Sequence, residues 1–390
     1  MRCSAVLISA VTFAGLAFGQ TPDPIKPLVD RLDLERYKAT IKGLTQFGDR
    51  RQGTERNRAA NDWIETQLKS YGCGNTERLT YDYQVPTPAT GGAGRGSGGR
   101  GPGRAGVRTK GVRGPTGVNN DPMKQRDEKL RALNTPPSVS GERQEVYCTK
   151  IGTKHPEEMY VVSAHMDGIG WGEAANDDAS GTAIVLELAR ILNSPEVETE
   201  RSVRFILWNN EESGTNGALA YVNQRKDLQG KEDPAGSGKY PEPKWLGVIQ
   251  HDMMLFDHGM PGKDGKPGKD QRVEADVNIE FQANSKMAAE SAALAWQVHA
   301  ANEKYATEYP ANVGPHMSNT DSARFQDFVA SISLRENERM LHIGTGWDPH
   351  WHQPTDLFVN FTDADFKLGL NAAQSTLGAV AQLAGARVKP

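Results

Sequence analysis

This chain of 390 residues has few cysteines, a small net charge and few long apolar runs. It has three cysteines and a formal net charge of −4 at pH 7. A chain so close to neutrality has no global basic field, so a nucleic-acid partner is not expected. Beyond the N-terminal segment, no apolar run is long enough to form a transmembrane helix. The sequence therefore predicts a protein without a membrane span.

The N-terminal segment has the pattern of a signal peptide. Arg2 supplies a positive charge, residues 6–18 are apolar, and the small residues Ala17 and Gly19 stand where a signal peptidase would cut. We therefore expect residues 1–19 to be removed and the mature protein to be secreted or periplasmic. A buried N-terminal helix is the alternative.

The remaining cysteines permit one disulfide at most. If the N-terminal segment is cleaved, Cys3 is lost and Cys73 and Cys148 remain. In an oxidising compartment these two could form a bond, but both could equally be buried thiols. The sequence leaves both possibilities open.

One segment is rich in glycine and arginine, and its composition is not that of a hydrophobic core. Residues 91–117 consist largely of Gly, Arg, Pro and small side chains, and the flanking sequence is polar from about residue 86 to residue 142. Such a segment buries too little apolar area to offset its ordering entropy. We expect a disordered insert at 86–142 that carries no metal ligand or catalytic residue, with binding to RNA or to an acidic surface as the alternative. A second surface loop is expected at 259–269.

The rest of residues 20–390 alternates between helix and strand patterns. Apolar residues at helical spacing predict helices, and short apolar runs predict buried strands. This alternation predicts a single α/β catalytic domain with a mostly parallel central sheet and helices on both faces. The predicted helices are 56–71, 181–192, 213–225, 285–301 and 362–384, and the predicted strands are 145–149, 159–164, 203–208, 246–250, 277–283 and 330–334.

Histidine and acidic residues stand just past the ends of three predicted core strands. They are His165, the pair Glu211-Glu212, and Asp252. In open α/β sheets ligands bind at the carboxyl ends of the strands. We therefore expect these side chains to converge on one crevice.

Two further fragments complete a set of metal-ligand types. Asn176-Asp177-Asp178-Ala179-Ser180-Gly181 precedes a predicted helix, and His352 stands four residues before Asp356. Two imidazoles with several carboxylates are a plausible ligand set for two Zn²⁺ ions. Such a pair suits the hydrolysis of an amide by a zinc-activated water. A helix N-cap is the alternative for the acidic fragment, because Asp and Ser are favoured there.

The carboxylate pair Glu211-Glu212 indicates a division of roles. Adjacent carboxylates repel, which raises one pKa unless a cation is present. With a metal bound, one of them can be a ligand while the other remains a general base. Asp167, two residues after His165, is the natural partner for the second nitrogen of that imidazole. The alternatives are a solvated acidic turn for the pair and a capping or surface role for Asp167.

In their order and spacing, these five fragments resemble the zinc aminopeptidases of peptidase family M28, which are co-catalytic di-zinc exopeptidases. The resemblance covers about residues 152–361 and touches Arg51-Gln52-Gly53-Thr54. It implies a zinc-exopeptidase-like fold and two Zn²⁺ ions as cofactors. It also implies a role for each residue: His165 and Asp252 bind one zinc, Glu212 and His352 bind the other, Asp177 bridges both, Glu211 is the general base, Asp167 orients His165, and a cis peptide follows Asp177.

Three features depart from the family pattern. Trp351 stands where many members have Tyr, and its indole N–H makes it a candidate substrate-binding residue. Asn319-Thr320-Asp321-Ser322 stands where many members have Arg-Ser-Asp-His, so a substrate-contacting Arg and His are missing. The basic insert is the third departure. The His-x-x-x-Asp pattern selects His352, rather than His342 or His350, as the late ligand.

The combined interpretation is an exported zinc aminopeptidase that acts on peptide substrates. Glu211 would take a proton from the attacking water and deliver it to the leaving amine. A glutaminyl-cyclase-like acyltransferase and a carboxypeptidase are alternatives on the same fold. A non-catalytic receptor-like domain is a third, although all five ligands and the base are present. The sequence indicates neither the oligomeric state nor the side-chain specificity.

Overall fold

The computed structural model describes residues 23–85, 117–137, 140–256, 276–306, 308–315, 319–336 and 348–389. Its α-helices are α1 Lys26–Val29, α2 Leu34–Thr45, α3 Glu55–Ser70, α4 Glu128–Leu133, α5 Ala179–Leu192, α6 Asn216–Arg225, α7 Ala288–Tyr305 and α9 Asp363–Ala384. Its strands are β1 Glu77–Tyr83, β2 Gly141–Lys150, β3 His155–His165, β4 Val197–Glu198, β5 Arg201–Trp208, β6 Lys244–His251, β7 Val277–Glu280, β8 Ala311–Gly314, β9 Ser331–Arg335 and β10 Arg387–Val388. Within the described residues, three short 3₁₀ helices are η1 Pro122–Lys124, η2 Asp321–Arg324 and η3 Phe358–Asn360.

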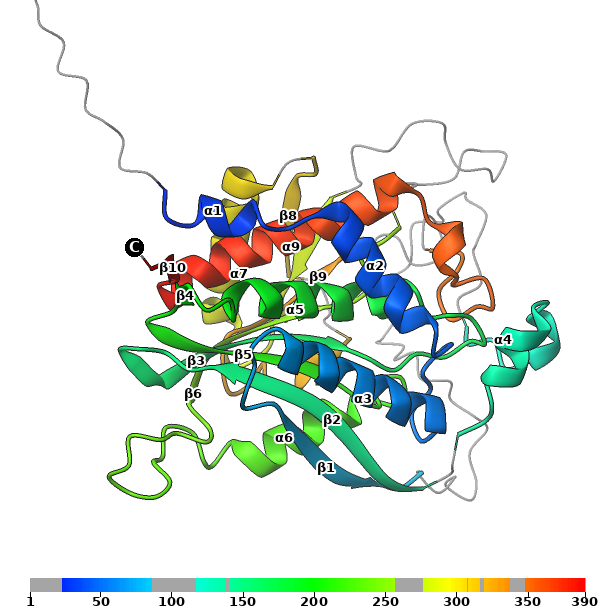
Figure 1. The fold of residues 1–390 in the computed structure, drawn as a ribbon, viewed down its shortest axis with the longest axis horizontal. Coiled ribbons are helices and arrows are strands. Elements are labelled where there is room, and N and C mark those ends of the chain that lie inside the picture. The colour runs from blue at the N-terminus through cyan, green and yellow to red at the C-terminus, as the bar shows by residue number, and fades with distance from the viewer. Residues whose placement is uncertain are drawn as a thin grey trace, which may run out of the picture.

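A central sheet of eight strands organises the described chain (Figure 1). The strand order is β1-β2-β5-β3-β6-β9-β7-β8, and β4 pairs separately with β10. The four central strands β5, β3, β6 and β9 are mutually parallel, as are β7 and β8, whereas the other neighbouring pairs are antiparallel. The parallel centre places the carboxyl ends of four strands at one edge of the sheet. The predicted α/β class with a mostly parallel sheet is therefore confirmed.

Helices cover both faces of this sheet, but unequally. The larger core packs α2, α3, α5, α7 and α9 against one face, and a smaller core packs α6 and Phe325 against the other. Strand β5 shows why both faces are apolar: Phe205 and Leu207 enter the larger core, while Ile206 and Trp208 enter the smaller one. Because side chains alternate along a strand, a continuous apolar run can satisfy two buried faces.

The predicted elements lie close to the observed ones, and several elements were not predicted. Each of the five predicted helices and six predicted strands overlaps one of the structure's elements, with ends displaced by a few residues. Outside the predicted insert, the prediction missed α1, α2, the edge strand β1, the short strand β8 and the small β4–β10 pair. No helix in the described parts of the chain is long and apolar enough to cross a membrane.

The prediction of a disordered insert from 86 to 142 is wrong for residues 117–137. That segment contains η1 and α4, and β2 begins at Gly141. Its order comes from buried polar side chains: Asn134 accepts a hydrogen bond from the Asp49 N–H at 3.0 Å and donates to the Gly172 carbonyl at 2.8 Å. Residues 86–116 lie outside the described residues, as does the loop predicted at 259–269.

Cys73 and Cys148 are joined by a disulfide bond. Cys73 follows α3, and Cys148 lies in β2, so the bond ties the end of α3 to the sheet. Of the two possibilities that the sequence left open, the structure has the disulfide.

Candidate two-metal active site

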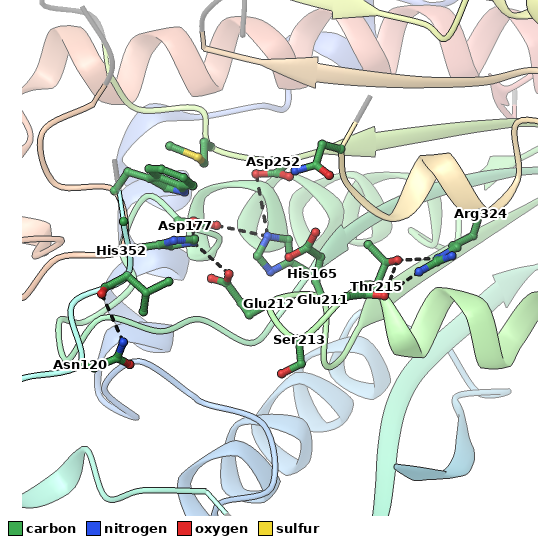
Figure 2. A pocket seen from close by; sticks show the side chains of 16 residues that line it. Asn120, His165, Asp177, Glu211, Glu212, Ser213, Thr215, Asp252, Arg324 and His352 are labelled. Atoms are coloured by element: carbon green, nitrogen blue, oxygen red, sulfur yellow. Dashed lines mark hydrogen bonds and ion pairs between the residues drawn. The ribbon is translucent and has the colours of Figure 1, made fainter. Parts of the chain in front are cut away.

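The candidate site lies at the carboxyl ends of the parallel strands. His165 is the last residue of β3, and Asp252 directly follows β6. Glu211 and Glu212 follow β5 after a tight turn, in which Asn210 has a φ of 65°. This left-handed conformation is one that Asn tolerates better than most residues. Figure 2 shows that these side chains converge, as expected.

Asp177 lies between the two histidines. Its Oδ1 is 3.2 Å from His165 Nε2, and its Oδ2 is 3.0 Å from His352 Nε2. One carboxylate therefore faces two imidazoles with its two different oxygens. Asp177 is in this way common to two groups of three possible ligands, His165–Asp177–Asp252 and Asp177–Glu212–His352.

One further carboxylate completes each group. Asp252 Oδ1 lies 3.8 Å from His165 Nε2, and Glu212 Oε2 lies 2.9 Å from His352 Nε2. Within each group the ligand atoms lie within 4.8 Å of one another. In Figure 2, the side chains of these five residues point toward a common centre. All five ligands expected from the sequence are thus brought together, in two sets that share Asp177.

Backbone hydrogen bonds to two other aspartates fix the position of Asp177. Asp356 accepts from the Asn176 N–H at 2.8 Å and from the Asp177 N–H at 3.1 Å. Asp178 caps α5 through the Gly181 N–H, and it also accepts from the His165 and Met253 N–H groups. The capping alternative is therefore correct for Asp178, although Asp177 faces the histidines. The peptide between Asp177 and Asp178 is cis, as the resemblance implied.

The contact between Asp167 and His165 differs from the prediction. His165 Nδ1 lies 3.0 Å from the backbone carbonyl oxygen of Asp167, whereas the nearest carboxylate oxygen is 3.8 Å away. The Asp167 carboxylate instead accepts a hydrogen bond from the Glu211 N–H at 3.0 Å. Asp167 thus contacts His165 through its main chain and the Glu211 turn through its side chain, because the turn brings backbone donors closer than the imidazole.

The electrostatics of the cluster favour a bound cation. Burial raises the pKa of Glu212 to about 7, although His352 opposes the shift. Burial also raises the pKa of Glu211 well above its usual range. Burial would lower the pKa of His352, but Glu212 and Asp177 raise it to about 10. Buried carboxylates this close together repel one another, so ionising all of them is energetically unfavourable. A bound metal ion would offset that repulsion.

The donor set of the cluster also fits zinc. Zn²⁺ prefers imidazole nitrogen and carboxylate oxygen among the groups present here. Glu212 Oε1 is buried without a hydrogen-bond partner in the described structure. That oxygen has lost its contact with water and gained no protein donor, which suits a ligand to a cation. The residues present therefore fit two zinc ions.

Arg335 is a residue of the site that the sequence interpretation missed. It is the last residue of β9, it is 2% exposed, and its Nη2 donates to Asp252 Oδ2 at 2.7 Å. This contact occupies one oxygen of Asp252 and leaves Oδ1 facing His165. The signal was present in the sequence, because the strand-end rule that identified His165 and Asp252 applies equally to β9.

The five residues of the cluster line a cavity of about 770 Å³. Trp351 lines this cavity and stacks on the ring of His352, with ring centroids 4.2 Å apart. The structure thus places Trp351 at the cavity, beside one of the candidate metal ligands. Three residues from the segment predicted to be inert, Gly117, Val118 and Asn120, also line the cavity. His350 is not among the lining residues of this cavity, and its Nδ1 contacts Thr355 Oγ1 instead.

Comparison with solved structures places this fold among known enzymes. An aminopeptidase from Aneurinibacillus sp. strain AM-1 superposes with a TM-score of 0.59 at 16% identity, covering 94% of this chain and 96% of that one. A glutaminyl cyclase from Porphyromonas gingivalis superposes with a TM-score of 0.54 at 16% identity, covering 90% and 99%. At these identities the likeness shows the fold, which both kinds of enzyme share.

Sequence comparison is more specific but covers less of the chain. Aminopeptidase YwaD from Bacillus subtilis is 32% identical over 133 residues, which is 33% of this chain and 28% of that protein. Human carboxypeptidase Q is 35% identical over 75 residues, 19% of this chain and 16% of that protein. Each match thus spans less than a third of the relative's length. The sequence model of peptidase family M28 matches residues 146–369, a range that contains all five candidate ligands and Glu211. The chain belongs to peptidase family M28.

Proposed function

We propose that this protein is a zinc-dependent aminopeptidase with two metal ions. The observation that carries the proposal is the position of Asp177, whose two oxygens face His165 and His352 at 3.2 and 3.0 Å. His165 and Asp252 would hold one zinc, Glu212 and His352 would hold the other, and Asp177 would be shared. When bound, zinc would polarise the scissile carbonyl and lower the pKa of a coordinated water.

Glu211 is the residue that we propose as the general base. It lines the cavity beside His165 but belongs to neither group of ligands, so its carboxylate is available to hold a proton. It would take a proton from the attacking water and deliver it to the leaving amine. The Asp167 carboxylate, through the Glu211 N–H, would fix the backbone from which that side chain projects.

The acidic cluster also suits the recognition of a free amino terminus. Asp177, Glu211, Glu212 and Asp252 all line the cavity. Carboxylates that are not fully neutralised by bound metal attract an ammonium group. This charge distribution is what favours removal of N-terminal residues. The sequence match with aminopeptidase YwaD supports the same choice.

Two other activities are the alternatives to test. Cyclisation of N-terminal Gln is one, because a glutaminyl cyclase shares the fold, and removal of C-terminal residues is the other, because of the sequence matches with carboxypeptidase Q. A digest of a peptide library, read by mass spectrometry, separates the three activities. We expect successive loss of N-terminal residues by protein that holds about two zinc ions per chain. Cyclised Gln peptides or C-terminal trimming as the main product would contradict the aminopeptidase proposal.

We also propose that the protein is exported. The disulfide between Cys73 and Cys148 supports this, because disulfides persist in oxidising compartments. In a host with a general secretory pathway, most of the protein should be found outside the cytoplasm, and N-terminal sequencing should start near Gln20. A product retained in the cytoplasm that still begins at Met1 would contradict the proposal.

A further inference from the structure

The segment that follows the Gly/Arg-rich run is attached to the loop that carries His352. The Asn119 N–H donates to the His352 carbonyl at 3.0 Å, and Gln353 Nε2 donates to the Gly117 carbonyl at 2.8 Å. Gln125 Nε2 donates to the Pro354 carbonyl at 2.9 Å. His352, Gln353 and Pro354 are thus each hydrogen-bonded to a residue of the segment 117–125.

The same segment is attached to a second loop of the site. Gln125 also donates to the Trp171 carbonyl at 2.8 Å, and Asn119 Nδ2 donates to the Gly170 carbonyl at 3.3 Å. Gln125 and Asn119 are 3% and 5% exposed. Buried amide side chains with satisfied donors have one favourable position. Residues 117–125 are thereby held across the loop that carries His352 and the loop between β3 and α5, which carries Asp177.

This attachment places Val118 at the wall of the cavity. Val118 lines the cavity together with Trp351 and Met253, and it retains 38% exposure. These three apolar side chains contrast with the acidic side chains of the metal cluster in the same cavity. In Figure 2, Asn120 lies below His352, on the side of the site away from Asp252. The cavity therefore has apolar as well as acidic lining residues, and Val118 is the apolar side chain that residues 117–120 contribute.

We propose that residues 117–120 are part of the substrate-binding site, and that Val118 contacts an apolar substrate side chain next to the scissile bond. The proposal rests on the proposed peptidase function and gives that site a specificity determinant. Peptidase pockets select side chains largely through apolar contact, with a modest discrimination per methylene. The contacting side chain could belong to the residue before or after the scissile bond, and the test distinguishes the two.

The test compares Val118→Ala with wild type on two pairs of dipeptides. One pair is Ala-Gly and Leu-Gly, and the other is Gly-Ala and Gly-Leu. In one of the pairs we expect the variant's preference for Leu over Ala, measured as kcat/KM, to fall about three- to tenfold. Zinc content should remain that of the wild type, because Val118 is not a ligand. The matched control is Met123→Ala, which alters a 70% exposed side chain of the same segment outside the cavity lining.

Each outcome of the test bears on the proposal. A reduced Leu preference in either pair, with Met123→Ala unchanged, supports it and identifies the side of the scissile bond. An unchanged preference in both pairs for Val118→Ala and for the bulkier Val118→Trp overturns it. If the zinc-loaded wild type cleaves none of the four dipeptides but trims longer peptides, the same comparison is made on Ala- and Leu-initiated peptides. A wild type that is inactive on every peptide contradicts the proposed function itself.

Discussion

Glu211→Gln should lose about 10²- to 10⁴-fold in kcat while binding zinc as the wild type does. The amide has nearly the shape of the carboxylate but cannot accept a proton from water. Glu211 is in neither group of ligands, so the metal-binding side chains remain in place. Its backbone N–H, which donates to Asp167, is also unaffected by the change. Turnover of an amino-acyl anilide and zinc content by atomic absorption are the two measurements.

Glu157→Gln is the matched control for this substitution. Glu157 lies near the beginning of β3, at the opposite end of that strand from His165. The substitution makes the same change in charge and volume as Glu211→Gln, but on a side chain that is 39% exposed. We expect wild-type turnover from the control. Near-wild-type hydrolysis by Glu211→Gln would rule out Glu211 as the base, and loss of zinc would make it a ligand instead.

The positions of the ligands were predictable because they depend on a general property of parallel sheets. His165 ends β3 and Asp252 follows β6; both strands are apolar on both faces, and such strands are readily recognised in a sequence. Once those strands are parallel neighbours, their carboxyl ends must meet at one edge. The pairing of particular oxygens and nitrogens depends on loop geometry, which the sequence gives only through the family resemblance.

The contact of Asp167 shows the limit of this reasoning. A His-x-Asp pattern indicates that the two side chains are close, and they are, at 3.8 Å. It does not show which acceptor of Asp167 the imidazole contacts. That choice depends on where the Glu211 turn presents its N–H groups, and the turn is 44 residues further along the chain. Competition between donors that are distant in sequence is not visible in a local motif.

Residues 117–137 were mispredicted for a related reason. Composition indicates disorder when a segment lacks apolar side chains to bury. Here order comes from a few buried amides, such as Gln125 and Asn134, whose partners are backbone carbonyls and N–H groups of other loops. Those partners lie up to 229 residues away in the sequence. A local estimate of hydrophobicity does not include such contacts.

The edge strand β1 was missed although its pattern was present. Leu79, Tyr81 and Tyr83 are buried and alternate with exposed residues, which is the period of a half-buried strand. Its neighbour in the sheet, β2, lies beyond the Gly/Arg-rich segment in the sequence. A short strand without an obvious nearby partner was therefore not recognised as part of the sheet.

Replacing Asp177 should remove both zinc ions, whereas replacing a ligand of one group should remove only one. Asp177→Asn substitutes a neutral amide, a poor zinc ligand, in the one side chain that both groups share. We expect its zinc content to fall from about two ions per chain toward none after dialysis against a weak chelator. His165→Ala and His352→Ala should each retain about one, because each removes an imidazole from a single group. Turnover should be lost in Asp177→Asn by at least as much as in Glu211→Gln.

His350→Ala is the control for these variants. It removes an imidazole near the site that is not positioned as a ligand, so it separates the effect of ligand position from the effect of losing a histidine. His350 is two residues from His352, but its Nδ1 contacts Thr355 Oγ1 and its ring packs against Phe361. It belongs to neither ligand group, so zinc content should not change. If Asp177→Asn kept one tightly bound zinc, the two groups would be independent sites and the shared carboxylate would be an incorrect description. If His165→Ala instead lost both ions equally, zinc binding by one group would depend on zinc binding by the other. A single bridging carboxylate produces that dependence only if neither ion binds without its neighbour.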